Sequence, residues 1–498
     1  MKNSRVCIFS VIFVLFCLNV NTFGQKRGKK ESSSQGYEIK FIFEGLRDTL
    51  LYFARTHVDQ TFIYDTLFLS KKEPFTYISK KDTILPRGFY VLGNQDKAKL
   101  MDIVIDSSHS FVVKATNLNP SAPDIMNNVI FINSPENEAM NNFFLTMSKF
   151  QRQMITLNNE IKREEAEEEP DAELIESKRQ ERRVLQGDMM EYRLNFLEAN
   201  KHTLFGKAQH FTRDIEIPEP PRNPDGSLVD SHFAYNYYLN HYWDHMDFTD
   251  PAMLSIPQNV FYDKLKAYFD DVVPPLVDSI IKYADILIEK SKNTPELFRY
   301  FVWYITNKYE RSQYVAHDAV FVHMVQKYYA RGLCPWTDEA VLERMVTHAN
   351  KLSHILIGKK APELIMADTN DLFYSNYGIN KKYTVMWFWD LKCGHCKTAA
   401  PKLVEFYNRA KDSLDFEIYA ICMTTDIEGW KQAIIDREFT WINVGGNRAN
   451  LDYRVVYDVT TTPVIFVLDK DKNIIVKRIG IDELENFIRN YDDGKIKY

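Results

Sequence analysis

The sequence predicts a multidomain protein with an N-terminal all-β, sandwich-like domain, a central α-helical domain that contains a helical hairpin, and a C-terminal α/β domain. Three observations predict this fold class. The chain has 498 residues, which is too long for one ordinary core. The spacing of apolar residues changes from two to three or four after residue 130. Strand-like and helix-like segments alternate after residue 355. We therefore expect domains at 37–130, 131–355 and 356–498.

In the first domain, short segments of alternating apolar and polar residues are separated by turn residues, which is typical of a small β-sandwich. Examples are "YEIKFIF", "TFIYDTLFL", "GFYVLG" and "MDIVID". No cluster of catalytic residue types lies in this domain.

In the second domain, apolar residues step by three or four from Met140 to Ile161 and predict one long helix. Ser134 is a candidate N-cap, with Pro135 at the first helical position. The charged segment around Pro170 interrupts the pattern, and the apolar stripe restarts at Leu185. We therefore expect an antiparallel hairpin, followed after a proline-rich loop by further helices up to residue 355.

The third domain combines strands and helices in alternation. The expected strands are "YTVMWFW", "FEIYAICM", "TPVIFVLD" and "NIIVKRI". The expected helices are "CKTAAPKLVEFYNRAKD", "IEGWKQAIID" and "DELENFIRNY". This order predicts a sheet with helices on both faces.

Composition excludes several classes of protein. Apolar residues make up 45% and charged residues 26%, as in globular domains. The net charge of −6 argues against a nucleic-acid partner. Beyond the N-terminus, no run is apolar and long enough to cross a bilayer, so we expect no stable membrane span in the mature chain.

The N-terminus is typical of a secretory signal peptide. Lys2 and Arg5 precede the apolar run "VCIFSVIFVLFCL", and small residues follow near a cleavage site before Gln25. We assign residues 1–24 to the signal peptide and 25–36 to a flexible polar leader. A retained anchor helix is one alternative, although the run of about 13 apolar residues is short for a span. A lipid-anchored envelope protein modified at Cys17 is another, for which Phe16 is a poor preceding residue.

Two cysteines, Cys393 and Cys396, lie between an aromatic strand and a helix. Six cysteines occur in the chain, of which two lie in the signal peptide, so the mature protein is no disulfide scaffold. A zinc site would require further ligands, and none follow at suitable spacing, so we expect no metal. A structural staple would close too short a loop to constrain the unfolded chain.

A redox pair fits the position of these cysteines. The free amide groups and dipole at a helix N-terminus favour a thiolate on Cys393. Lys392, Lys397 and a charged His395 would add to this effect. Cys396, one turn into the helix, is expected to be buried and to act as the resolving thiol.

The segments "WFWDLKCGHCKTAAP" and "YDVTTTPVIFVLD" resemble the thioredoxin superfamily, and most of all its TlpA/ResA branch of exported thiol–disulfide proteins. The whole chain is similar to exported redoxin-domain proteins of Gram-negative bacteria, which place a β-domain and a helical domain of unknown function before the thioredoxin unit. The resemblance covers 358–498 most specifically. It implies a thioredoxin fold with an extra strand and helix near 424–444.

The resemblance also implies an activity and a site. The activity is reduction or isomerisation of protein disulfides in the periplasm, by a reversible Cys393–Cys396 disulfide around Gly394 and His395 and without another cofactor. Its partners would be protein dithiol or disulfide substrates and an unidentified electron donor. Thr462 and Pro463 would form a cis-proline loop that offers backbone groups to an extended substrate.

Two departures from the family weaken the assignment of proton transfer. Trp387 occupies the position of the buried aspartate of thioredoxins, and Ala399 that of a glutamate in many exported relatives. Asp390 is the nearby carboxylate, and we hypothesise that it or a water substitutes. The departures also keep open a non-catalytic binding or scaffold protein. A peroxidase is a further alternative, although Asp390 stands where peroxiredoxins need Thr or Ser.

Other candidates have structural interpretations. We expect Cys334 and Cys422 to be buried inert thiols, with a bridge between them as the alternative. His241 and His245 have a spacing that suits zinc on a helix, but no third ligand is evident, and an aromatic packing site is favoured.

Overall fold

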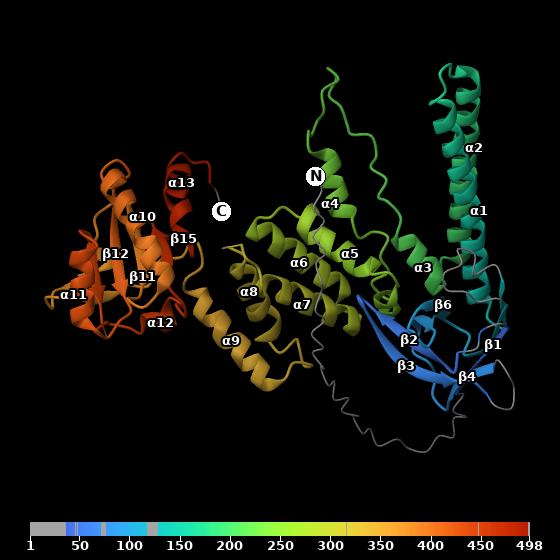
Figure 1. Cartoon of the computed structure of the whole chain (residues 1–498), viewed down its shortest axis with the longest axis horizontal. Coiled ribbons are helices and arrows are strands. Elements are labelled where there is room, and N and C mark those ends of the chain that lie inside the picture. The colour runs from blue at the N-terminus through green and yellow to red at the C-terminus, as the bar shows by residue number, and fades with distance from the viewer. Residues whose placement is uncertain are drawn as a thin grey trace.

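The computed structural model describes residues 36–44, 46, 48–70, 76–116, 128–314, 316–446 and 448–496. The predicted signal peptide and the leader up to residue 35 lie outside this range. Figure 1 shows the β-domain, the helical domain and the α/β domain following one another across the molecule. Within the described residues, no helix is both long and apolar enough to cross a membrane.

The N-terminal domain is a sandwich of two four-stranded sheets, with strand orders β4-β1-β7-β8 and β3-β2-β5-β6. Alternate residues of β1, including Tyr37 and Phe41, point into the core between the sheets. The prediction of an all-β sandwich is confirmed, although β8 extends across the expected boundary at residue 130. The strands are β1 Tyr37–Glu44, β2 Leu50–His57, β3 Gln60–Phe68, β4 Thr76–Lys81, β5 Gly88–Gly93, β6 Lys99–Ile105, β7 Ser110–Thr116 and β8 Val129–Ile132.

The predicted hairpin is formed by α1 (Pro135–Glu164) and α2 (Ala172–Asn200), which project together from the body of the protein (Figure 1). Pro135 begins α1 as expected, but Ser134 makes no capping bond to the helix backbone. The Ser134 Oγ instead accepts a hydrogen bond from Asn137, whose amide also bonds to the backbone of Val104 on β6. The base of the hairpin is therefore anchored to the sandwich.

The remaining helices share one aromatic-rich core that includes Trp243, Tyr268 and Phe301. A buried carboxylate, Asp250, joins this domain to the sandwich because it accepts hydrogen bonds from Arg87 (2.5 Å) and Lys207 (2.8 Å). The helices are α3 Leu204–Phe211, α4 Phe233–His241, α5 Val260–Ala267, α6 Val277–Ser291, α7 Pro295–Glu310, α8 Asp318–Met324 and α9 Glu339–Ser353.

The C-terminal domain has a five-stranded sheet in the order β13-β12-β11-β14-β15. Strands β11, β12 and β13 are parallel, whereas β14 and β15 are antiparallel to their neighbours. The strands are β9 Ile365–Ala367, β10 Phe373–Ser375, β11 Tyr383–Trp389, β12 Phe416–Cys422, β13 Ile442–Gly445, β14 Val464–Leu468 and β15 Ile474–Lys477. The helices are α10 Gly394–Ala410, α11 Ile427–Asp436, α12 Tyr453–Val456 and α13 Ile481–Asp492.

This topology fixes the location of the cysteine pair. Strand β11 is central and fully buried, and it ends just before the pair. Because β14 runs antiparallel to β11, with Phe388 opposite Val464, the start of β14 lies beside the end of β11. The extra helix and strand predicted from the family resemblance are present as α11 and β13.

Candidate redox site

A tight turn delivers Cys393 from β11 to the first turn of α10. The Asp390 carboxylate accepts a hydrogen bond from the Lys392 amide (2.8 Å), and the Asp390 carbonyl accepts one from the Cys393 amide (3.2 Å). Cys393 is the N-cap residue of α10, with extended backbone. Pro401 lies inside this helix, as the resemblance implied.

The sulfur of Cys393 contacts both the helix and the proline loop. Its Sγ accepts a hydrogen bond from the Cys396 amide at 3.1 Å, and its thiol donates one to the Thr462 carbonyl at 3.3 Å. The Thr462–Pro463 bond is cis. Both cysteines are free thiols in this structure.

The two thiols have different environments. Burial alone would raise the pKa of Cys393, but hydrogen bonds from the Cys396 thiol and amide, from the Thr462 side chain and from the His395 amide outweigh burial and lower that pKa. Burial raises the pKa of Cys396, and the adjacent Cys393 raises it further. Cys396 is fully buried, whereas Cys393 is partly exposed. The arrangement therefore supplies one accessible thiolate and one protected thiol.

An aromatic cluster fills the space behind the pair. Trp387, at the position of the family's buried aspartate, is completely buried and stacks on Trp389 with ring centroids 5.2 Å apart. Phe439 packs edge-on against both rings. The carboxylate of Asp390 is engaged in the turn. The substitution thus replaces an ionisable group with apolar surface beneath the thiols.

The other predicted site residues lie at the surface around Cys393. Lys392, Gly394, His395 and Lys397 are exposed. A Cβ atom added to Gly394 would meet nothing within 4 Å, so sterics do not require glycine there. Their contribution to substrate binding or thiolate stability stays a prediction.

A contact behind the proline loop was not predicted from the sequence. The Arg478 guanidinium donates to the Asp458 carboxylate (2.7 Å) and to its carbonyl (3.2 Å). Asp458 lies just before the threonine run that leads to Pro463. A basic residue after a strand and an aspartate twenty positions earlier give no local signal for this pairing.

The remaining candidates lie apart from the site or in inert surroundings. Cys334 packs in the helical core and Cys422 in the core of the α/β domain, and both are free thiols, so no bridge joins them. Helix α4 ends at His241, which stacks on Tyr237 and bonds to Asp244. His245 lies beyond that helix, and the two histidines do not share a helical face.

One matching family model agrees with the fold of the C-terminal domain. Residues 380–474 match a family model described as thioredoxin-like, and residues 197–352 match a domain of unknown function (DUF5106). The chain is similar to a domain of a possible thiol-disulfide isomerase from Cytophaga hutchinsonii, with 37% identity over 28% of this chain and 95% of that chain and a TM-score of 0.27. It is also similar to the thioredoxin domain of a thiol-disulfide oxidoreductase from Bacteroides vulgatus, with 28% identity over 27% and 96% of the two chains and a TM-score of 0.25.

A thioredoxin-like protein from Bacteroides caccae is similar over a longer stretch, with 17% identity over 55% of this chain and 99% of that chain and a TM-score of 0.41. No curated protein matches the chain. Through its C-terminal domain the chain belongs to the thioredoxin-like family, and a DUF5106 domain precedes that unit.

Proposed function

We propose that this protein is an exported thiol–disulfide oxidoreductase in which Cys393 is the attacking thiol and Cys396 the resolving thiol. The observation that carries the proposal is the asymmetry of the pair. Cys393 is partly exposed at the N-terminus of α10 with its pKa lowered, whereas Cys396 is buried with its pKa raised. The cis Thr462–Pro463 bond lies against the Cys393 sulfur, where an extended substrate would pair with the loop.

The reaction proceeds in two exchange steps. The Cys393 thiolate attacks one sulfur of a substrate disulfide, forms a mixed disulfide and releases the other substrate sulfur as a thiolate that takes up a proton. Cys396 then loses its proton, and its thiolate attacks the Cys393 sulfur. The Cys393–Cys396 disulfide forms and the second substrate thiol leaves. Two electrons pass from the pair to the substrate, and an external dithiol donor restores the reduced pair.

We place the reaction in the periplasm, in line with the apolar N-terminal run, with a lipid-anchored envelope protein as the alternative. The substrates are protein disulfides, and the redox pair itself serves in place of a cofactor. The resemblance to exported family members favours reduction or isomerisation over net oxidation.

Trapping and redox equilibration test the proposal in the mature full-length chain. The Cys396→Ser variant is expected to accumulate a mixed disulfide with a disulfide-bonded peptide, and Cys393→Ser to accumulate none. A reduction potential near about −270 mV would support a reductase, and one near about −180 mV an isomerase. Failure of the wild-type pair to cycle in glutathione buffers would overturn the proposal.

One observation favours a second candidate, a binding protein without redox turnover. Trp387 fills the position of the proton-transferring aspartate and leaves no buried carboxylate there. Under this alternative, Cys396→Ser would trap no substrate, and substrates would bind the Thr462–Pro463 loop equally well to the double cysteine-to-serine variant.

A further inference from the structure

Strand β15, at the edge of the thioredoxin-like sheet, ends in a lysine that contacts the helical domain. Lys477 is 2% exposed. Its ammonium forms an ion pair with Asp318 at the start of α8 and donates to the Ile355 carbonyl at 2.8 Å, just after α9. A buried ammonium is stable only when such partners are present, so Lys477 ties β15 to the helical domain.

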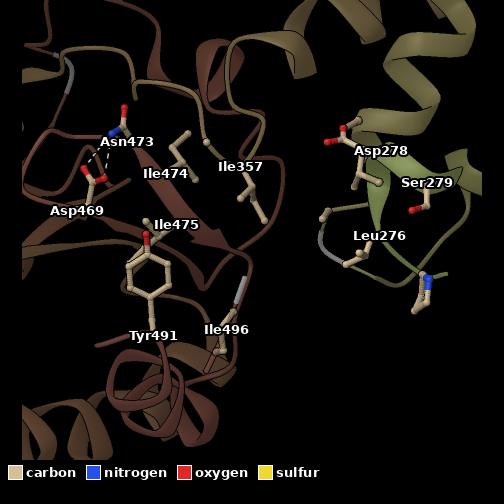
Figure 2. A pocket seen from close by; sticks show the side chains of 15 residues that line it. Leu276, Asp278, Ser279, Ile357, Asp469, Asn473, Ile474, Ile475, Tyr491 and Ile496 are labelled. Carbon is tan, nitrogen blue, oxygen red and sulfur yellow. Dashed lines mark hydrogen bonds between the residues drawn. The ribbon is translucent and has the colours of Figure 1, made fainter. Parts of the chain in front are cut away.

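The contact around Lys477 lies beside a hydrophobic core that continues from the helical domain into the α/β domain, and it has open space on one side. A cleft of about 830 Å³ separates the two domains on one side. Figure 2 shows Ile357, Ile474 and Tyr491 on the thioredoxin-like side of this cleft, and Leu276 and Asp278 on the helical side. Lys477 therefore adds a directional polar contact between the domains near β15, next to the hydrophobic core that they share.

The next residue, Arg478, contacts the segment that leads into the proline loop. Its amide donates to the Ile465 carbonyl on β14 at 2.7 Å, two residues after Pro463. Its guanidinium bonds to Asp458 just before the loop. Arg478 thus holds both ends of the segment that presents the Thr462 carbonyl to Cys393.

Backbone geometry shows that this connection is under constraint. Arg478 has φ of +57° and Asp458 has φ of +48°, and both lie in the left-handed region. For residues other than glycine this conformation is unfavourable, and it persists where the surroundings hold it. Here the strained residues are bonded to each other, directly behind the loop.

We propose that Arg478 is a positioning residue for the cis-proline loop, and that Lys477 makes the position of that loop depend on docking of the helical domain. This inference rests on the proposed oxidoreductase function. The helical domain then does more than occupy space beside the redox unit. It sets how well an extended polypeptide fits against the loop, and this effect on substrate fit is larger than the effect on the Cys393 sulfur that Thr462 contacts.

The test uses the mature full-length chain with Cys396→Ser as background, so that the rate of mixed-disulfide formation is measured directly. Two probes are compared: hydroxyethyl disulfide, which is too small to pair with the loop, and a disulfide-bonded extended peptide. Lys477→Met and Arg478→Ala are expected to slow the reaction with the peptide about tenfold, because small misplacements of a docking segment are costly. Both variants should slow the reaction with hydroxyethyl disulfide by less than about twofold, because the loop contacts the Cys393 sulfur only through Thr462. Arg478→Lys should recover most of the peptide rate.

Lys472→Met is the matched control. Lys472 is also a buried lysine of the β14–β15 hairpin, but it bonds to Ile379 and Thr384 within its own domain. It should lower stability without changing the ratio of the two rates. Hydrogen exchange of the amide at position 478 should accelerate in Lys477→Met and not in Lys472→Met.

Each outcome has a separate meaning. The inference would be overturned if Lys477→Met and Arg478→Ala slowed the reactions with the peptide and with hydroxyethyl disulfide equally, or slowed neither. It would also be overturned if the ratio of these two rates were the same in Lys472→Met and Lys477→Met. A wild-type background that fails to react even with hydroxyethyl disulfide would instead overturn the proposed function.

Discussion

At pH 7, Cys393 is expected to react with iodoacetamide at least about 10³-fold faster than Cys334 or Cys422. Burial raises the pKa of each of these two thiols to about 12, which leaves a thiolate fraction of about 10⁻⁵ at pH 7. The pKa of Cys393 is below the ordinary value of 9.0, which gives a fraction above about 10⁻². Because the thiolate is the reacting species, the ratio of these fractions is the minimum expected ratio of rates.

Timed alkylation of the fully reduced protein, quenched and mapped by peptide mass spectrometry, follows all four thiols of the mature chain in one sample. The alkylation rate of Cys393 should rise about tenfold per pH unit as pH increases. This rise should level off before pH 9.0 is reached, because the pKa of Cys393 is below that value. Cys396 should resist alkylation because it is buried and its pKa is raised. A Cys393 profile with its midpoint at or above 9.0, or faster labelling of Cys396, would refute the assigned roles of the two thiols.

Four further substitutions have expected outcomes. Gly445→Ala should destabilise the protein by about 1–3 kcal/mol in urea denaturation, because its Cβ would meet the backbone oxygen of Cys422 at 2.8 Å. Gly187→Ala, in open space within α2, should instead stabilise the protein by about 0.5–1 kcal/mol in the same assay. Burial alone would raise the pKa of Asp285, but bonds from a histidine, a lysine and a tyrosine lower it to about 2. Asp285→Asn should therefore lower the free energy of unfolding by about 2 kcal/mol at neutral pH. The difference in unfolding free energy between wild type and variant should vanish as pH falls from about 4 to about 2, because a lowered folded-state pKa stabilises the fold only above that range. A difference that stays unchanged at low pH would contradict this. Asp390→Asn should leave mixed-disulfide resolution within about twofold because asparagine can keep the turn bond, and a loss beyond about tenfold would assign Asp390 a role in proton transfer.

Local patterns in the sequence predicted most of the fold. The alternation in β1 and the stripe from Met140 to Ile161 each reflect burial of one face, which is set within a single element. The position of Cys393 between a strand and the start of a helix was also predictable from the sequence. The cis-proline loop at Thr462–Pro463 was predicted from the family resemblance. The topology then brings these two motifs together without any further information.

Contacts between elements were not predictable in the same way. Lys477 lies near the end of the segment "NIIVKRI" and resembles an ordinary polar residue at a strand end, since nothing nearby in sequence marks Asp318 as its partner. Ser134 fits a capping pattern, yet the adjacent sheet draws Asn137 into a different set of bonds. His241 and His245 would share a helical face only if the helix continued through both residues, but α4 ends at His241. The ring of His245 packs against His210 instead.

The stacked indoles beneath the redox pair give the molecule a built-in optical signal. Trp387 and Trp389 share a buried core with Cys396, and Trp430 packs in the same core. Sulfur in a disulfide quenches the emission of nearby indoles more strongly than a thiol does. Oxidation and reduction of the pair should therefore change the intrinsic fluorescence, so electron flow through this protein can be followed continuously without a dye or an engineered label.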